Sequence, residues 1–149
     1  MFYRDKPKPQ PVEPYANKKL TAAEAGPLIN HLELFIQQQQ PYLNADLTMP
    51  KLARQLGWPS SRLSQLLNDN LAQTFPDFIN RWRIEHAKTL MADQPAMKMQ
   101  TLAEQSGFNS LSTFYAAFKK FTGMTPARYK QNPPVLASET INPESGTMS

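Results

Sequence analysis

Residues that commonly carry out catalysis or bind metals are few in this sequence, and their spacing suits neither task. The two histidines, His31 and His86, each fall in a region of helical pattern without a metal-spaced partner, and the chain has no cysteine. A glycine-rich phosphate loop, a G-x-S-x-G elbow and an H-E-x-x-H zinc motif are absent. We therefore expect no enzyme activity, no disulfide, no metal and no cofactor.

Polar side chains suited to hydrogen bonding with a partner are concentrated in two stretches, residues 60–70 and 110–121. The first stretch contains Arg62, Gln65 and Asn68. In the major groove of DNA, the amides of Gln and Asn pair bidentately with adenine, and arginine pairs with guanine. Base recognition is therefore the chemistry that these stretches could perform, provided that helices present them outward.

A repeated motif precedes each of the two stretches. Residues 52–58 read Leu-Ala-Arg-Gln-Leu-Gly-Trp, and residues 102–108 read Leu-Ala-Glu-Gln-Ser-Gly-Phe. After one inserted residue in the second copy, the match continues in four pairs: Leu63 with Phe114, Leu67 with Phe118, Thr74 with Thr125, and Phe78 with Tyr129. The chain is therefore expected to contain two copies of one helix-turn-helix unit, about 50 residues apart.

The residues that recur in the motif have steric roles in a helix-turn-helix unit. Its two helices cross steeply at close range, so only a small side chain fits at the crossing, and Ala53 and Ala103 provide it. The tight turn needs a positive φ, which glycine adopts without penalty. Gly57 and Gly107 follow the alanines by four residues, where this turn is expected.

The segment between the two copies also favours DNA binding. It is expected to form a helix of about 17 residues, roughly 26 Å long at 1.5 Å per residue. A spacer of that length could set two recognition helices one DNA turn apart, roughly 34 Å. A solenoid of helical hairpins is disfavoured, since solenoids need three or more copies at a shorter period. A helical protein-interaction module that has lost specific DNA binding stays as the alternative function.

Helical periodicity runs through the middle of the chain, and no stretch alternates as a strand would. The sequence thus predicts an all-α fold in which two helix-turn-helix units are joined by a long linker helix. About seven helices are expected, at about 22–39, 48–56, 60–70, 75–92, 98–106, 110–121 and 126–131. Side-chain N-caps are expected from Thr21 (in a capping box with Glu24), Thr48, Ser60 and Ser110.

Proline content and charge divide the chain into regions. Basic side chains exceed acidic ones by six in residues 49–131, whereas residues 1–48 are neutral and residues 132–149 carry −2. A basic excess confined to the middle favours a polyanionic partner. The expected organisation is a proline-rich linker at 1–20, an N-terminal helix region at 21–43, a DNA-binding domain at 44–131 and a flexible tail at 132–149. Within the DNA-binding domain, the first unit is expected at about 48–70, the linker helix at about 75–92 and the second unit at about 98–121.

The two recognition helices are expected at residues 60–70 and 110–121. Their residues expected to contact DNA bases are Ser61, Arg62, Ser64, Gln65 and Asn68 in the first, and Ser112, Thr113, Tyr115, Ala116 and Lys119 in the second. Phosphates are expected at the helix N-termini near residues 48–51 and 98–101. The charged phosphate contacts expected are Lys51, Arg81, Lys98 and Lys120.

One group of residues also carries a family resemblance. It comprises Gly107-Phe108, Phe114, Phe118-Lys119-Lys120, Gly123-Met124-Thr125-Pro126 and Tyr129 in the second unit, with Phe78-Ile79-Asn80-Arg81 and Arg83 at the start of the linker helix. With these residues, the region 44–131 resembles the C-terminal DNA-binding domain of the AraC/XylS family of bacterial transcription factors. The resemblance implies a homeodomain-like, AraC-type arrangement of seven helices that reads consecutive major grooves.

The resemblance also implies partners. Double-stranded operator DNA is the expected ligand, RNA polymerase is a candidate protein partner, and an upstream sensor or dimerisation domain is expected. The proline-rich start and the 22–39 helix resemble the region that follows a membrane-embedded sensor in some members. This likeness implies a fragment of a larger regulator, with membrane anchoring through the upstream part as an option. No run in the sequence approaches the ~18 apolar residues of a membrane span, so the cytoplasm is the expected compartment of the chain itself.

Three positions depart from the family pattern. Ala72 occupies a position where glycine is usual, so a strained or reshaped turn is expected after the first recognition helix. Lys130 replaces a commoner arginine, and Ala116 stands where many relatives place an arginine on bases. The first unit is therefore expected to read bases more fully than the second.

Overall fold

The computed structural model describes residues 19–131, and the predictions of a linker before residue 19 and a tail after residue 131 fall outside the described residues. Seven α-helices and no strand occur within the described range, which confirms the all-α prediction. The helices are α2 (Ala22–Gln39), α3 (Met49–Leu56), α4 (Ser60–Gln65), α5 (Phe75–Asp93), α6 (Met99–Gln105), α7 (Leu111–Thr122) and α8 (Pro126–Gln131). A 3-10 turn, η1 (Pro41–Leu43), follows α2, and a π-helical segment, η2 (Leu66–Asn70), continues α4.

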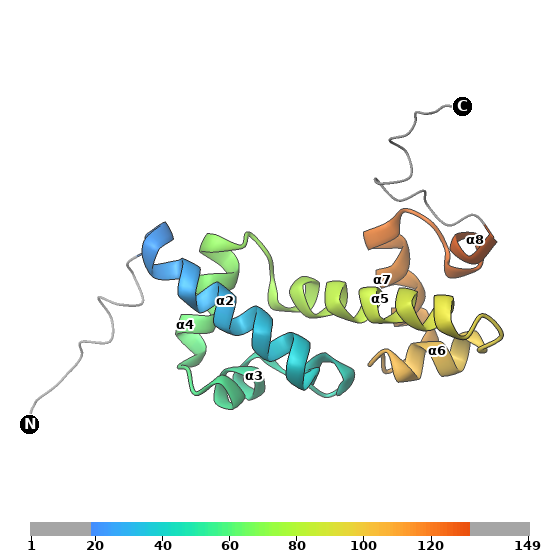
Figure 1. Cartoon of the computed structure of the whole chain (residues 1–149), viewed down its shortest axis with the longest axis horizontal. Coiled ribbons are helices and arrows are strands. Elements are labelled where there is room, and N and C mark those ends of the chain that lie inside the picture. The colour runs from blue at the N-terminus through green and yellow to red at the C-terminus, as the bar shows by residue number, and fades with distance from the viewer. Residues whose placement is uncertain (1–18, 132–149) are drawn as a thin grey trace, which may run out of the picture.

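The long helix α5 joins two separate hydrophobic cores (Figure 1). The N-terminal half of α5 contributes Phe78 and Ile79 to a first core shared with α2, α3, α4 and η2. Its C-terminal half contributes Ile84 and Ala87 to a second core shared with α6 and α7. Each helix-turn-helix unit therefore buries its own apolar side chains, and α5 belongs to both.

Small residues at the helix crossings and glycines in the turns behave as the sequence predicts. Ala53 and Ala103 are 1% and 0% exposed, so each crossing has room for little more than a methyl group. Gly57 has φ 78° and donates its N–H to the last carbonyls of α3, while Gly107 has φ 93°. Both turns thus use the left-handed region that glycine enters without a steric penalty.

Side-chain caps explain where most helices begin, with one prediction wrong. Thr21 and Glu24 form the predicted capping box, and Thr48 and Ser110 accept hydrogen bonds from the third residue of their helices. Ser60 does not cap α4, because Pro59 holds the N-cap position without a side-chain bond. The inserted residue in the second copy shifts the register, so the counterpart of Ser110 in the first unit is Pro59.

The first recognition helix is not one continuous α-helix. After Gln65 it widens into η2, where Leu71 N–H bonds five residues back to the carbonyl of Leu66 at 3.1 Å. The turn that follows places Ala72 at φ 55°, in the left-handed region. The strained turn expected from an alanine at this position is therefore confirmed.

The N-terminal helix α2 packs against the first unit (Figure 1). Ala25, Leu32 and Ile36 are buried in the first core, and the Asn70 side chain donates to the carbonyl of Leu20 at 3.4 Å. Within residues 19–131, no helix is both long and apolar enough to cross a lipid bilayer. The apolar face of α2 is therefore explained by its packing against η2 and by its part in the first core.

Candidate nucleic-acid interface

The outer face of α7 presents every base-contact residue predicted for the second unit. Phe114, Ala117 and Phe118 are buried, with Phe114 and Phe118 fully so, and this orients the helix. The opposite face carries the exposed residues Ser112, Thr113, Tyr115, Ala116 and Lys119. The start of the helix is fixed by Ser110, whose hydroxyl lies 2.7 Å from that of Thr113.

The corresponding face of α4 and η2 is smaller. Ser61 and Asn68 are exposed, whereas Arg62 and Ser64 are half-buried. The amide of Asn68 donates to the hydroxyl of Ser64 at 3.3 Å, so these two side chains present a joined polar edge. Four of the five predicted residues thus reach the surface to differing degrees.

The prediction that Gln65 contacts a DNA base does not agree with the structure. Its side chain is only 8% exposed and cannot reach a base in this conformation. Helical periodicity placed Gln65 opposite the buried Leu63, on the assumption that the far side of α4 is open. In the structure α3 packs against α4, and α2 packs against η2. The end of α4 is therefore enclosed on more than one side.

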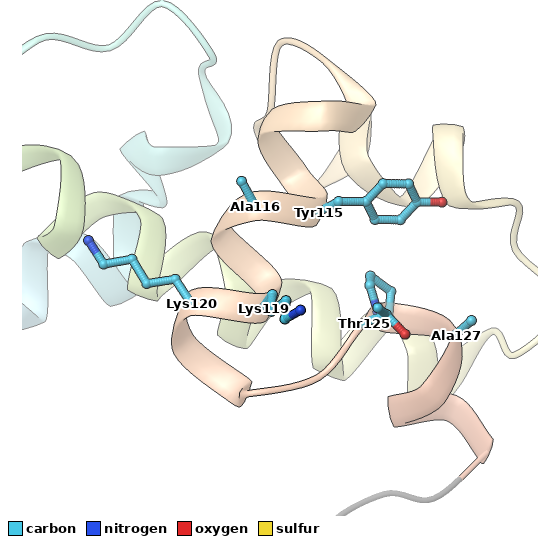
Figure 2. A pocket seen from close by; sticks show the side chains of 7 residues that line it. Tyr115, Ala116, Lys119, Lys120, Thr125 and Ala127 are labelled. Atoms are coloured by element: carbon cyan, nitrogen blue, oxygen red, sulfur yellow. The ribbon is translucent and has the colours of Figure 1, made fainter.

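A hollow of about 640 Å³ opens between α7 and the start of α8 (Figure 2). Tyr115, Ala116 and Lys119 form its α7 wall, and Thr125 and Ala127 face them from the other side. Tyr115 is 41% exposed although it is large and mostly apolar. The hollow therefore extends the predicted base-reading face of α7 towards α8.

The geometry of two helix-turn-helix units agrees with comparisons to known proteins. The sequence matches the family described as "Helix-turn-helix domain" over residues 52–132, more than half of the chain. The chain belongs to the AraC-type helix-turn-helix family. The match begins within α3, at Leu52, extends through α8 and leaves out α2.

Known relatives extend this assignment. An uncharacterized HTH-type transcriptional regulator of Staphylococcus aureus strain MSSA476 is 35% identical over 95 residues, which is 64% of this chain but 13% of that protein. The C-terminal domain of the two-component response regulator yesN from Fusobacterium nucleatum is 28% identical with a TM-score of 0.59, covering 69% of this chain and 97% of that one. A Chromobacterium violaceum regulator with an AraC-type DNA-binding domain shares the fold at 17% identity, with a TM-score of 0.59 over 76% of this chain and 100% of that one.

The cations predicted to hold phosphates differ in their surroundings. Lys51 and Lys98 are exposed near the N-termini of α3 and α6. By contrast, Lys120, which also lines the hollow, forms an ion pair with Asp77 at 2.7 Å (Figure 2). The guanidinium of Arg81 lies 4.9 Å from the ring centre of Phe121. Arg81 and Lys120 therefore link α5 to α7 in this AraC-type domain.

Sequence reasoning gives Arg83 no role beyond its place in the family pattern, whereas the structure gives it several contacts. Its guanidinium donates to the carbonyl of Tyr42 at 2.6 Å, to the carbonyl of Asn44 at 3.0 Å and to the side chain of Asn80 at 3.2 Å. Burial lowers the pKa of Arg83 below its ordinary value. No local pattern marks this role, because Tyr42 and Arg83 are 41 residues apart.

Titratable groups do not converge on a reactive centre in the part of the chain that the structure describes. No group of three or more metal-binding side chains occurs there. His86 packs edge-on against Tyr42, with ring centres 6.0 Å apart, and burial lowers the pKa of His86. These contacts give His86 a packing role in the first unit.

Proposed function

We propose that this AraC-type chain is a sequence-specific DNA-binding domain of a transcription regulator, and that it places α4 and α7 in successive major grooves. The observation that carries the proposal is the duplication itself, since two helix-turn-helix units are joined by one continuous helix. At 19 residues, α5 is roughly 28 Å long, close to the roughly 34 Å turn of DNA. DNA binding without catalysis accounts for the two units and for the length of the helix that joins them.

The second unit offers the fuller base-reading face. Five exposed side chains lie on one face of α7, whereas the buried Gln65 reduces the set on α4 and η2 to Ser61, Arg62, Ser64 and Asn68. The methyl groups of Thr113 and Ala116 suit contact with a thymine methyl, Arg62 suits guanine, and Asn68 suits adenine. This order reverses the one expected from side-chain types alone.

Phosphate contacts are proposed at the outer helix starts. Lys51 and Lys98 are exposed there, at the N-terminal ends of α3 and α6, where the helix dipole favours anions. Arg81 and Lys120 could reach phosphates only by exchanging the contacts that they make with Phe121 and Asp77. We expect them to contribute less to affinity than Lys51 and Lys98.

The regulator as a whole is also a matter of proposal. This chain spans 13% of the length of the Staphylococcus aureus relative, which supports attachment to a sensor or dimerisation domain. The proposed setting is the cytoplasm, with operator DNA and RNA polymerase as partners. Membrane anchoring through such an upstream domain fits the same picture.

Selection of bound duplexes from a random pool tests the proposal. Against the selected duplex, Thr113→Ala is expected to change preference at one base pair, because it removes a methyl and a hydroxyl from the exposed face. Lys51→Ala is expected to weaken binding to all duplexes alike and to reduce the salt slope by about one.

Lys88→Ala is the matched control for Lys51→Ala, because Lys88 lies on the C-terminal half of α5 and pairs with Glu85 at 2.8 Å. The proposal fails if the wild-type chain enriches no sequence over bulk competitor. Retention that is independent of both sequence and salt would favour a protein-interaction module instead.

A further inference from the structure

The two units meet at one narrow junction beside the middle of α5. The last fully buried α5 residue of the first core is Ile79, with Trp82 packed against that core, and the first buried residue of the second core is Ile84. Arg83 lies at this boundary. Its position allows contact with both units, whereas the neighbouring buried residues each belong to one core.

From α5, Arg83 reaches the connection between α2 and α3. It donates Nε to the carbonyl of Tyr42 and Nη2 to the carbonyl of Asn44, and its third bond, from Nη1 to Asn80, returns to α5. The planar guanidinium presents these donors in a fixed fork, a geometry that a lysine ammonium cannot reproduce. Arg83 thus binds two backbone carbonyls of the connection that leads into the first unit.

The turn of the second unit closes on the same side chain. Gly107 lies so near that a Cβ built on it would overlap the carbonyl oxygen of Tyr42 and lie 3.0 Å from Arg83 Nε. The guanidinium carbon of Arg83 is 5.8 Å from the ring centre of Phe108, and Asn109 donates to the carbonyl of Ala45 at 3.5 Å. Arg83 is therefore enclosed between residues 42–45 and residues 107–109.

Other contacts between α7 and the first half of α5 lie on a different side of that helix. Arg81 and Arg83 are two residues apart, which places them about 200° apart around the axis. The Lys120–Asp77 ion pair is 58% and 35% exposed at its two side chains, and exposed pairs contribute little to stability. The junction at Arg83 is held by three hydrogen bonds, whereas the contact with α7 consists of this exposed ion pair and the Arg81–Phe121 contact.

We propose that Arg83 is a positioning residue that fixes the orientation of the two recognition helices relative to each other by clamping residues 42–45 against the turn at 107–109. The inference rests on the proposed function, since orientation matters only if both helices engage one duplex. Two linked reading elements bind far more tightly than one, and that gain is lost if geometry prevents both from engaging. Arg83 would then govern two-site binding without touching DNA.

The distance between the two units can be measured directly, because the chain has no cysteine. Gln55→Cys and Gln105→Cys place spin labels at equivalent exposed positions of the two repeats. We expect a narrow distance distribution by electron–electron double resonance in the wild type. Arg83→Met should broaden or shift it, while Lys88→Met, which removes another cation from α5, should leave it unchanged.

Binding to selected duplexes provides the second readout. Arg83→Met is expected to lose about tenfold or more in affinity for a duplex with both half-sites. Affinity for a single half-site should stay at the wild-type level. A purely structural role would instead lower both affinities together.

The results separate the clamp from the proposed function. Wild-type distances and wild-type two-site affinity in Arg83→Met would overturn the clamp. A wild-type chain that binds no selected duplex would overturn the proposed function, and the spin-label distances would still test the clamp. If Arg83→Met fails to unfold cooperatively, Arg83→Lys replaces it, since lysine keeps the positive charge but lacks the planar guanidinium. The same changes in spin-label distances and in two-site affinity are expected for Arg83→Lys.

Discussion

The two helix-turn-helix units share one scaffold and differ in what surrounds it. Both use a buried alanine at the crossing and a glycine at positive φ in the turn. A Cβ on Gly57 would meet no heavy atom within 4 Å among the described residues, whereas one on Gly107 would meet the first unit. Gly57 is therefore required by its backbone conformation alone, whereas Gly107 is also required by the close approach of Tyr42 and Arg83.

The recognition helices differ as well. In the first unit a short α4 passes into the π-helical η2, which packs against α2, and the turn that follows has Ala72 at φ 55°. In the second, α7 runs regularly for 12 residues and ends at Gly123 with φ 80°. Helix α2 thus encloses the end of the first recognition helix, and the second unit keeps the wider free face.

The largest effect is expected from the anchors of the recognition helices. Phe114 and Leu63 are equivalent, and both are 0% exposed. Phe114→Ala should lower the free energy of unfolding by about 3–5 kcal/mol and Leu63→Ala by about 2–5 kcal/mol, since each leaves a cavity in a separate core. Urea denaturation followed by circular dichroism measures both, and a loss below about 1 kcal/mol in either unit would contradict its core assignment.

Substitution of the two turn glycines sharpens the comparison. Gly57→Ala should cost about 1–2 kcal/mol from the left-handed backbone alone. Gly107→Ala should cost about 1–3 kcal/mol more, because its Cβ would also displace the carbonyl of Tyr42. Equal losses in urea denaturation would show that the close approach at Gly107 carries no weight.

The residues that end the recognition helices offer an exchange experiment. Ala72 and Gly123 are equivalent and both have positive φ. Ala72→Gly should stabilise the fold by less than about 1 kcal/mol, and Gly123→Ala should destabilise it by about 1–2 kcal/mol. Thermal unfolding of the two variants checks the signs, and a destabilising Ala72→Gly would argue against strain at that turn.

The smallest expected effect concerns pH. Because burial lowers the pKa of His86 in the folded state, the unfolded chain binds the proton first as the pH falls. Protonation of His86 has no effect on the free energy of unfolding above pH about 6.5, and it lowers that free energy progressively below this pH. His86→Gln should flatten that decline in urea midpoints between neutral and mildly acid pH, with His31→Gln as the control. An unchanged slope in His86→Gln would exclude His86 as its source.

The sequence predicted features that depend on local pattern. The repeated alanines and glycines, the caps at Thr48 and Ser110 and the anchors of each core follow from spacing alone. The burial of Gln65 depends on α2 and α3 packing around the first recognition helix. The contacts of Arg83 could not be predicted either, because its backbone acceptors lie about 40 residues away in sequence. Contacts between elements, rather than the elements themselves, are what periodicity omits.

Hydroxyl-radical footprinting of the wild-type chain on its selected duplex tests the central claim most directly. If α4 and α7 occupy successive major grooves, two protected stretches should appear on one face of the DNA, about 10 base pairs apart. Thr113→Ala and Asn68→Ala should each weaken protection in a different stretch. A single protected stretch, or protection that both substitutions weaken equally, would contradict two-groove binding.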